Sequence, residues 1–304
     1  MISRLLTSAS KIIVGKDQQL KLSLTCLIAN GHLLIEDMPG MGKTTLAQVL
    51  AKLFDLSYNR VQFTSDLLPA DIIGVSVYKQ QENNFEFKPG PIFSQLILAD
   101  EINRATPKTQ SALLEAMEEG QVTVDGETYP LPQPFFVIAT QNPQTQLGTF
   151  PLPESQLDRF LMRIHLGYPD PMAERKLMTG ENRRIMVQNA EPVIHVKDLL
   201  ALQRQVPGIH ISEAVLDYIQ QLVKFTRESK DFSTGLSPRG ALALVHTAKA
   251  WALVNNRDHV LPEDVQAIVP AVVEHRVRGA ADHTGHGGES MTEKMLATVD
   301  VISK

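Results

Sequence analysis

Short apolar runs without polar alternation alternate with helix-like segments through the first half of the chain. The runs are Leu33–Ile35, Leu96–Ala99 and Phe135–Ala139. Such runs are typical of parallel strands that are buried on both faces. The helix-like segments between them include Thr44–Phe54 and Thr109–Glu119. This alternation of strand and helix predicts an α/β domain with a central parallel sheet.

Two further segments have the pattern of β-hairpins. Val75–Phe87 alternates apolar and polar residues around Glu82-Asn83-Asn84, and Gln121–Leu131 does so around Asp125-Gly126. An Asp-Gly pair favours a type I′ turn, because that turn needs a positive φ at both central residues. We expect both hairpins to be insertions added to the parallel sheet and not members of it.

A domain boundary is predicted at Gly167–Pro171, where Pro and Gly interrupt the pattern. Asp170 and Pro171 suit the N-cap and first position of a new helix. We therefore expect an α/β domain over residues 1–169 and an all-helical lid domain over residues 170–304, without strands. The helices expected there are Pro171–Gln188, Val196–Val206, Ser212–Ser229, Pro238–Asn255 and Pro262–Val269.

Composition narrows the class of protein. The chain has 304 residues, which fits two domains, and a net charge of −5, which argues against a dedicated binder of duplex DNA. The single cysteine, Cys26, excludes an internal disulfide and a cysteine-based zinc site. His283 and His286 have the spacing of a metal-binding pair, but the sequence offers no evident third ligand.

Location is predicted from what the chain lacks. No apolar run approaches the 18 or so residues that a membrane-spanning helix needs. The first residues also lack the apolar core of a signal peptide. We therefore expect a cytoplasmic protein without a membrane span.

The segment after the first strand has the pattern of a phosphate-binding loop. It ends in Gly-Lys-Thr and enters a helix, so that backbone N–H groups and the helix dipole can surround an anion. Lys43 would reach the β- and γ-phosphates, and the Thr44 hydroxyl would bind Mg²⁺. The strict pattern has Gly where this chain has Asp37. The residues expected to line the loop are Pro39, Gly40, Met41, Gly42, Lys43, Thr44 and Thr45.

Polar residues follow the next two strands. Asp100 and Glu101 end one apolar run, and Asn142 follows another. Ligands of open α/β sheets bind at this carboxyl edge. Asp100 would then join the Mg²⁺ shell and Glu101 would orient and deprotonate the attacking water. Asn142 could contact the γ-phosphate or the water, although an Asn-Pro pair also marks ordinary turns.

Two arginines are candidates for stabilising a transferring phosphoryl group. Arg159 precedes the last strand of the first domain, where it is either an arginine finger or a simple partner of Asp158. Arg239 lies in the first turn of a helix that starts at Ser237-Pro238. A cation there opposes the helix dipole, at a cost of about 0.3–1 kcal/mol, which points to recruitment of a phosphate; the alternative is an exposed surface arginine.

These parts occur in an order that resembles the AAA+ ATPases over nearly the whole chain, and in detail the MoxR family. The matching stretches are Gln62–Thr64, Asp66–Pro69, Asp71, Gly90–Phe93, Leu98–Ala105, Lys108–Met117 and Ala139–Pro143. The two hairpins match the helix-2 insert and the pre-sensor-1 hairpin of this AAA+ branch. In that branch the lid is displaced, which leaves open whether Arg239 serves its own subunit or a neighbour.

The resemblance also implies roles for the individual residues. They are Lys43 and Thr44 in Walker A, Asp100 and Glu101 in Walker B, Asn142 as sensor 1, Arg159 as the arginine finger, Arg239 as sensor 2, and Val14 and Gly15 against the adenine.

The resemblance further implies an ATP- and Mg²⁺-dependent chaperone-like ATPase. Such proteins form homo-oligomeric rings, expected here to be hexamers. They mature client protein complexes, for example by assisting metal or cofactor insertion with a partner that carries a von Willebrand factor A domain.

Three alternatives remain. They are the motor subunit of a metal chelatase, a nucleic-acid motor, and a nucleotide-switched binding module with negligible turnover. Neither hairpin is basic, which disfavours the nucleic-acid motor. The presence of Glu101 disfavours a module without turnover.

Overall fold

The structure is a computed structural model, and it describes residues 1–142, 148–280 and 290–301. His283 and His286, the pair with metal-like spacing, lie outside the described residues, as does Pro143 of the Asn-Pro pair.

Five parallel strands form the central sheet in the order β2-β5-β8-β1-β9. Leu33 of β1 lies opposite Ile138 on one side and Met162 on the other. Every residue of β5 and β8 is buried, as their unbroken apolar runs predict. The expected parallel sheet is therefore confirmed. Its strands are β1 (Leu33–Glu36), β2 (Tyr58–Gln62), β5 (Leu96–Asp100), β8 (Phe136–Gln141) and β9 (Met162–Ile164).

Alternate residues of each strand enter hydrophobic cores on opposite faces of the sheet. Leu33 belongs to the core that includes residues of α2 (Asp17–Ile28) and α3 (Lys43–Leu53). Leu34 belongs to the other core, with residues of α5 (Pro107–Glu119). The sheet is thus covered on both faces, which is the arrangement that parallel sheets require.

The apolar pattern did not predict the edge strand β2 or the N-terminal helices α1 (Ile2–Ile12) and α2. In β2 only Val61 is buried, because this strand lies at the edge of the sheet. A half-exposed edge strand has no continuous apolar run, so this part of the sheet lacked the signal used for the others.

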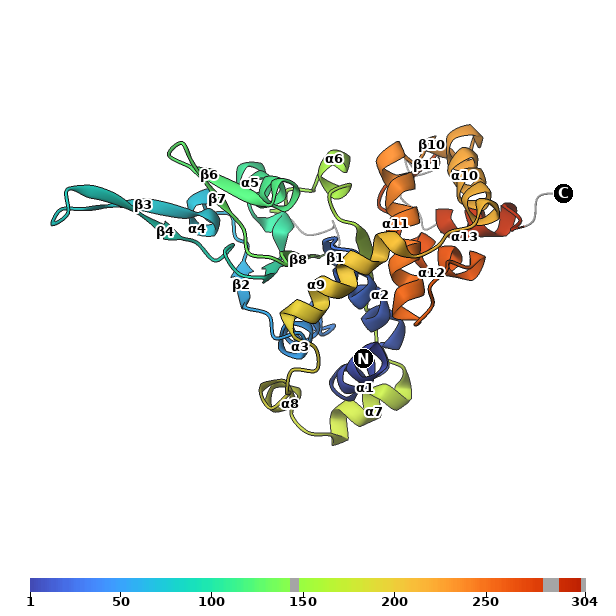
Figure 1. Cartoon of the computed structure of the whole chain (residues 1–304), viewed down its shortest axis with the longest axis horizontal. Coiled ribbons are helices and arrows are strands. Elements are labelled where there is room, and N and C mark those ends of the chain that lie inside the picture. The colour runs from blue at the N-terminus through green and yellow to red at the C-terminus, as the bar shows by residue number, and fades with distance from the viewer. Residues whose placement is uncertain (143–147, 281–289, 302–304) are drawn as a thin grey trace.

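Both expected hairpins form, and each is a separate two-stranded sheet. The strands are β3 (Gly74–Lys79) with β4 (Asn84–Pro89), and β6 (Gln121–Val124) with β7 (Glu127–Pro130). Asp125 and Gly126 have φ of 52° and 85°, as a type I′ turn requires. The β3–β4 hairpin projects from the body of the molecule (Figure 1). Phe87 stacks on Tyr129 with the ring centroids 4.1 Å apart, so the two hairpins touch near their bases.

Short elements complete the first half of the chain: α4 (Pro69–Ile73), α6 (Glu154–Leu157) and a 3₁₀ turn at Ile102–Arg104.

The second half of the chain is mainly helical, as expected. The later helices are α7 (Pro171–Thr179), α8 (Arg183–Gln188), α9 (Val196–Gln205), a 3₁₀ turn at Val206–Gly208, α10 (Glu213–Glu228), α11 (Pro238–Val254), α12 (Pro262–Val273) and α13 (Met291–Thr298).

Three expectations about this half were wrong. The single helix expected over Pro171–Gln188 is two helices, because α7 ends at Gly180 and the Asn182 side chain caps α8. The helix expected to end at Val269 continues to Val273, since burial of the residues after Pro270 outweighs one lost hydrogen bond. Two short strands, β10 (Phe232–Thr234) and β11 (Arg278–Gly279), pair where none were expected.

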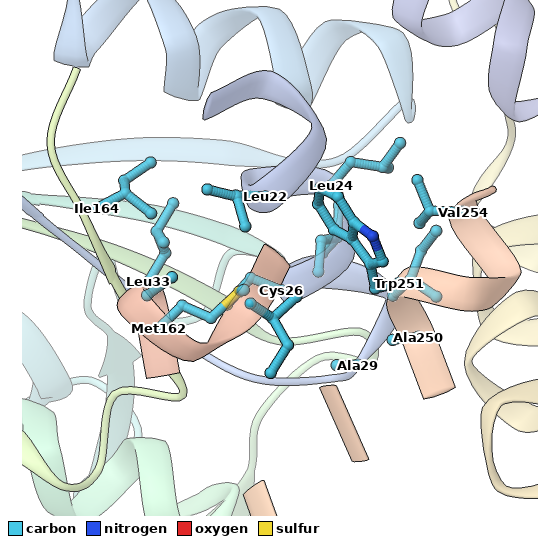
Figure 2. Close-up of a cluster of buried hydrophobic side chains, with 14 of the residues drawn as sticks. Leu22, Leu24, Cys26, Ala29, Leu33, Met162, Ile164, Ala250, Trp251 and Val254 are labelled. Atoms are coloured by element: carbon cyan, nitrogen blue, oxygen red, sulfur yellow. The ribbon is translucent and has the colours of Figure 1, made fainter. Parts of the chain in front are cut away.

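A continuous core joins the sheet to the helical half. Figure 2 shows α2 side chains such as Leu24 and Cys26 between Leu33 of the sheet and Trp251 of α11. Helix α8 instead contacts α1 and α3, so the chain packs back on the first half beyond residue 169. The boundary at that residue stays a prediction. In the described part of the chain, none of the helices has the length and apolarity needed to cross a membrane.

Candidate active site

The phosphate-loop segment lies between the end of β1 and the start of α3. Gly40 and Gly42 have φ of 87° and 90°, a region that residues with a Cβ rarely adopt. A Cβ at either position would meet no atom within 4 Å, so the backbone conformation and not crowding favours glycine. The first N–H groups of a helix have no intrahelical partner, so the start of α3 is suited to a phosphate. Pro39, Met41, Thr44 and Thr45 lie in the same segment.

Lys43 is buried at the carboxyl edge of the sheet, with 7% of its surface exposed. Its Nζ donates to the Asp37 carbonyl at 2.6 Å and to Asn142 Oδ1 at 3.2 Å. Burial lowers the pKa of Lys43, while nearby carboxylates, Asp100 foremost, oppose that shift. An anion arriving here would meet a partly desolvated cation, whose attraction is stronger than in water.

Asp37, which stands where the strict loop pattern has glycine, has a structural role. Its carboxylate accepts hydrogen bonds from the backbone N–H groups of Leu166 and Gly167. It therefore anchors the rim of the loop to the segment that follows β9. The departure from glycine leaves Gly40, Gly42 and Lys43 in place.

Glu101 and Asn142 are in direct contact. Asn142 Nδ2 donates to Glu101 Oε1 at 3.0 Å. Asn142 is 4% exposed and also accepts from Lys43, so it connects the loop lysine to the glutamate. The other carboxylate oxygen of Glu101 accepts from Gln62 Nε2 and from Arg104, each at 3.1 Å.

The backbone of Glu101 is in the left-handed region, with φ of 55°. A non-glycine residue there is strained by roughly 1–3 kcal/mol. The Thr140 hydroxyl accepts from the Glu101 N–H at 2.9 Å and so holds this turn. This left-handed backbone ends the extended course of β5 directly after Asp100.

Asp100 ends β5 and is buried. One carboxylate oxygen accepts from the Thr140 hydroxyl at 2.6 Å, and the other forms an ion pair with Arg60 at 2.6 Å. Mg²⁺ prefers hard oxygen ligands and usually takes only one or two from protein, with phosphates and waters completing the shell. The Asp100 carboxylate and the Thr44 hydroxyl, at the carboxyl edge of the sheet, fit that requirement.

Val14 and Gly15 lie in the turn between α1 and α2. A Cβ on Gly15 would lie 2.6 Å from the Cβ of Ala173, so the close approach of α7 requires glycine there. The neighbouring Lys16 donates to the Tyr168 carbonyl at 2.5 Å. Asp37 of the phosphate loop binds the backbone N–H groups of Leu166 and Gly167, just before Tyr168. Residues 166–168 therefore link the Val14–Gly15 turn to the phosphate loop.

The two arginines lie apart from this group. Arg159 forms an ion pair with Glu118 at 3.0 Å, and Arg239 donates to the same carboxylate at 3.2 Å. They line the same cavity as residues 29–32, which precede the amino end of β1, whereas Lys43 follows its carboxyl end. The four residues of β1 span roughly 13 Å at about 3.3 Å per residue. The alternative of a simple Arg159–Asp158 pair was wrong, because Asp158 pairs with Arg276 and Arg239.

Several residues of the site were not anticipated. Gln62 lies at the carboxyl end of β2. Polar residues at the carboxyl ends of strands are site candidates, as Asn142 was, but Gln62 was missed because β2 was not predicted. Glu118 gave no local signal, since it is one of several charged residues on α5. The remaining additions are Arg60, Thr140 and Arg276.

Comparisons with known proteins agree with this arrangement. Residues 32–162 match the model of the ATPase family associated with various cellular activities (AAA), and residues 224–295 match that of the AAA lid domain. A crystal structure of a Cytophaga hutchinsonii protein proposed to be an ATPase has a TM-score of 0.88 and 40% identity. It covers 99% of this chain and 95% of its own.

Relatives in several bacteria match most of the chain. The Bacillus subtilis protein YeaC is 44% identical, covering 99% of this chain and 95% of its own. Chaperone MoxR1 of Mycobacterium tuberculosis is 39% identical, covering 91% of this chain and 75% of its own. Protein MoxR of Paracoccus denitrificans is 31% identical, covering 88% and 85%. This chain therefore belongs to the MoxR family of AAA+ ATPases.

Proposed function

We propose that this protein hydrolyses ATP at the carboxyl edge of its sheet. The contact of one buried amide, Asn142, with both Lys43 and Glu101 carries this proposal. It supports the proposal because a cation suited to phosphates, a carboxylate suited to act as a base and a polar group that could position them form one continuous chain of contacts. A structural polar cluster would not need the two positive-φ glycines that open the loop beside it.

Each group has a defined part in the reaction. Lys43 binds the β- and γ-phosphates, and Glu101 orients a water molecule and accepts its proton as it attacks the γ-phosphorus. Asn142 keeps Glu101 at the distance from the phosphate at which that water fits. Mg²⁺, held by Thr44 and Asp100, would neutralise charge on the phosphate oxygens. Val14 and Gly15 would contact the adenine.

The separation of the arginines supports a homo-oligomeric ring, which we propose to be a hexamer. Arg159 and Arg239 are at the sheet edge opposite Lys43, so a phosphate that they contact would belong to another subunit. A finger supplied by a neighbour completes the site only on assembly.

We propose that the ring acts in the cytoplasm as a chaperone that matures a client protein complex, with a von Willebrand factor A partner. The motor subunit of a metal chelatase is the alternative with similar architecture. The charges of the hairpins disfavour a nucleic-acid motor, because Lys79 and Lys88 both pair with Glu86 and the other hairpin carries Asp125 and Glu127. A groove for a phosphate backbone needs uncompensated positive charge.

Phosphate release, measured with and without Mg²⁺ over a range of protein concentrations, tests this proposal. We expect Mg²⁺-dependent turnover whose specific activity rises with concentration as rings assemble. Turnover that is independent of concentration, in a protein shown to remain monomeric, would contradict the shared site. Binding of ATP without any turnover by assembled rings would instead favour a nucleotide-switched module.

A further inference from the structure

A cavity of about 700 Å³ lies at the amino edge of the sheet, between the end of α5, the loop before β9 and helices α9 and α11. Four guanidinium groups and two carboxylates line it, which leaves an excess of two positive charges. These groups belong to Arg159, Arg204, Arg239, Arg276, Glu118 and Asp158.

Glu118 holds two of these arginines at once. Its Oε2 pairs with a terminal nitrogen of Arg159 at 3.0 Å, and its Oε1 accepts from a terminal nitrogen of Arg239 at 3.2 Å. One carboxylate thereby fixes the spacing of two like charges that would otherwise repel each other. Each contact uses a single terminal nitrogen of a guanidinium group that has five N–H donors.

The two arginines come from different parts of the chain. Arg159 precedes β9 and Arg239 starts α11, so Glu118 bridges the α/β half and the helical half. Beneath them Arg276 is 4% exposed at its side chain and is fixed by the Phe160 carbonyl at 2.7 Å and by Asp158 at 2.6 Å. Asp158 then lies 3.6 Å from Arg239. Arg276 is thus buried and hydrogen-bonded, whereas Arg159 and Arg239 are 27% and 51% exposed at their side chains.

We infer that Glu118 is a positioning residue that holds Arg159 and Arg239 together, so that they act as a pair on the triphosphate of a second copy of this chain. The inference rests on the proposed ATPase function. Glu118 does not touch the phosphate itself. Two guanidinium groups at a fixed spacing engage a γ-phosphate without first being oriented, which favours the transition state.

The variant Glu118→Gln tests this inference, because it keeps the shape of the side chain and removes its charge. We expect unchanged ATP binding and ring assembly, and a turnover number about 10- to 100-fold lower, the effect of misplacing a catalytic group. The matched control is Glu119→Gln, which removes a charge from the next, exposed residue and should leave turnover within about twofold of the original.

A second measurement separates positioning from a general structural defect. If Glu118 acts through the arginine pair, adding Glu118→Gln to Arg239→Ala should slow turnover by no more than about twofold, because there is no longer a pair to hold. Losses that multiply would overturn the inference. So would normal turnover in Glu118→Gln, or an equal loss in Glu119→Gln. Normal turnover in Arg159→Ala would instead contradict the proposed function.

Discussion

Asn142 donates a hydrogen bond from its side-chain amide to the Glu101 carboxylate at 3.0 Å, across the carboxyl ends of two adjacent strands. The oxygen of the same amide accepts a hydrogen bond from Lys43. A nucleotide that moves Lys43 would therefore also shift Asn142 and, through it, the Glu101 carboxylate. Gln62 holds the second carboxylate oxygen of Glu101. The carboxylate is therefore held on both sides before a nucleotide arrives, and a water molecule must compete with these amides for it.

The first prediction separates binding from turnover. Lys43→Ala should lose ATP binding, because it removes the buried cation. Glu101→Gln should bind ATP and lose turnover by about 10²–10⁴-fold, the usual contribution of a positioned general base. Titration with a fluorescent ATP analogue and a phosphate-release assay measure the two properties. Normal hydrolysis by Glu101→Gln would show that another group activates the water.

The second prediction concerns the residue that departs from the strict loop pattern. Asp37→Gly restores that pattern but leaves the N–H groups of Leu166 and Gly167 without their acceptor. We expect the free energy of unfolding to fall by about 1–3 kcal/mol, measured by denaturant titration. Asp37→Asn is the control, because its amide oxygen still accepts. An Asp37→Gly variant as stable as the original protein would contradict the anchoring role.

The carboxyl-edge half of the site could be predicted from sequence because its residues follow buried strands. A continuous apolar run marks a buried strand, and parallel topology brings the strand ends together, so Asp100, Glu101 and Asn142 were located by position alone. Gln62 was missed because the edge strand before it is mostly polar. For the same reason the number of strands in the sheet was not predictable.

The amino-edge cluster could be predicted only in part. Arg159 and Arg239 were identified as candidates from family resemblance and from an unfavourable position at a helix start. Glu118, the partner that both arginines share, was not identified, because it is 41 residues from Arg159 and 121 from Arg239 along the chain. Contacts of such separation depend on how α5 and α11 pack, and no local periodicity encodes that packing.

The third prediction concerns the hairpin formed by β6 and β7, which we expect to contact the client or partner. Gly126→Val should distort the turn, because a β-branched residue resists the φ of 85° found there. Gly126→Asn is the control, since asparagine tolerates a positive φ. We expect the valine variant to keep ATP hydrolysis and lose client maturation in cells. Full maturation by a folded, hydrolysing valine variant would remove the hairpin from the client-binding surface.

The fourth prediction concerns the finger. Arg159→Ala should bind ATP, because Arg159 is remote from Lys43, and should lose about 10³–10⁵-fold in rate. Nucleotide titration and phosphate release again separate the two effects. Normal turnover would exclude the finger role for Arg159. Arg104 and Arg163, which pair with Glu101 and Glu36 nearer the carboxyl edge, would then be the candidate fingers.

The last prediction tests whether the finger acts between subunits. Glu101→Gln subunits still carry Arg159, and Arg159→Ala subunits still carry Glu101, so a mixed ring contains some interfaces in which both groups are intact. Activity should therefore reappear when the two inactive variants are combined under conditions of subunit exchange, which fluorescence energy transfer between labelled subunits can verify. The control is a mixture of each variant with the double variant, in which no interface is complete. A mixture that exchanges subunits and stays inactive would mean that Arg159 acts within its own chain, or that hydrolysis needs coordination around the whole ring. Dilution of the original protein distinguishes these two outcomes. The rate per subunit should fall as rings dissociate if hydrolysis needs the whole ring, and should stay constant if Arg159 completes the site within its own chain.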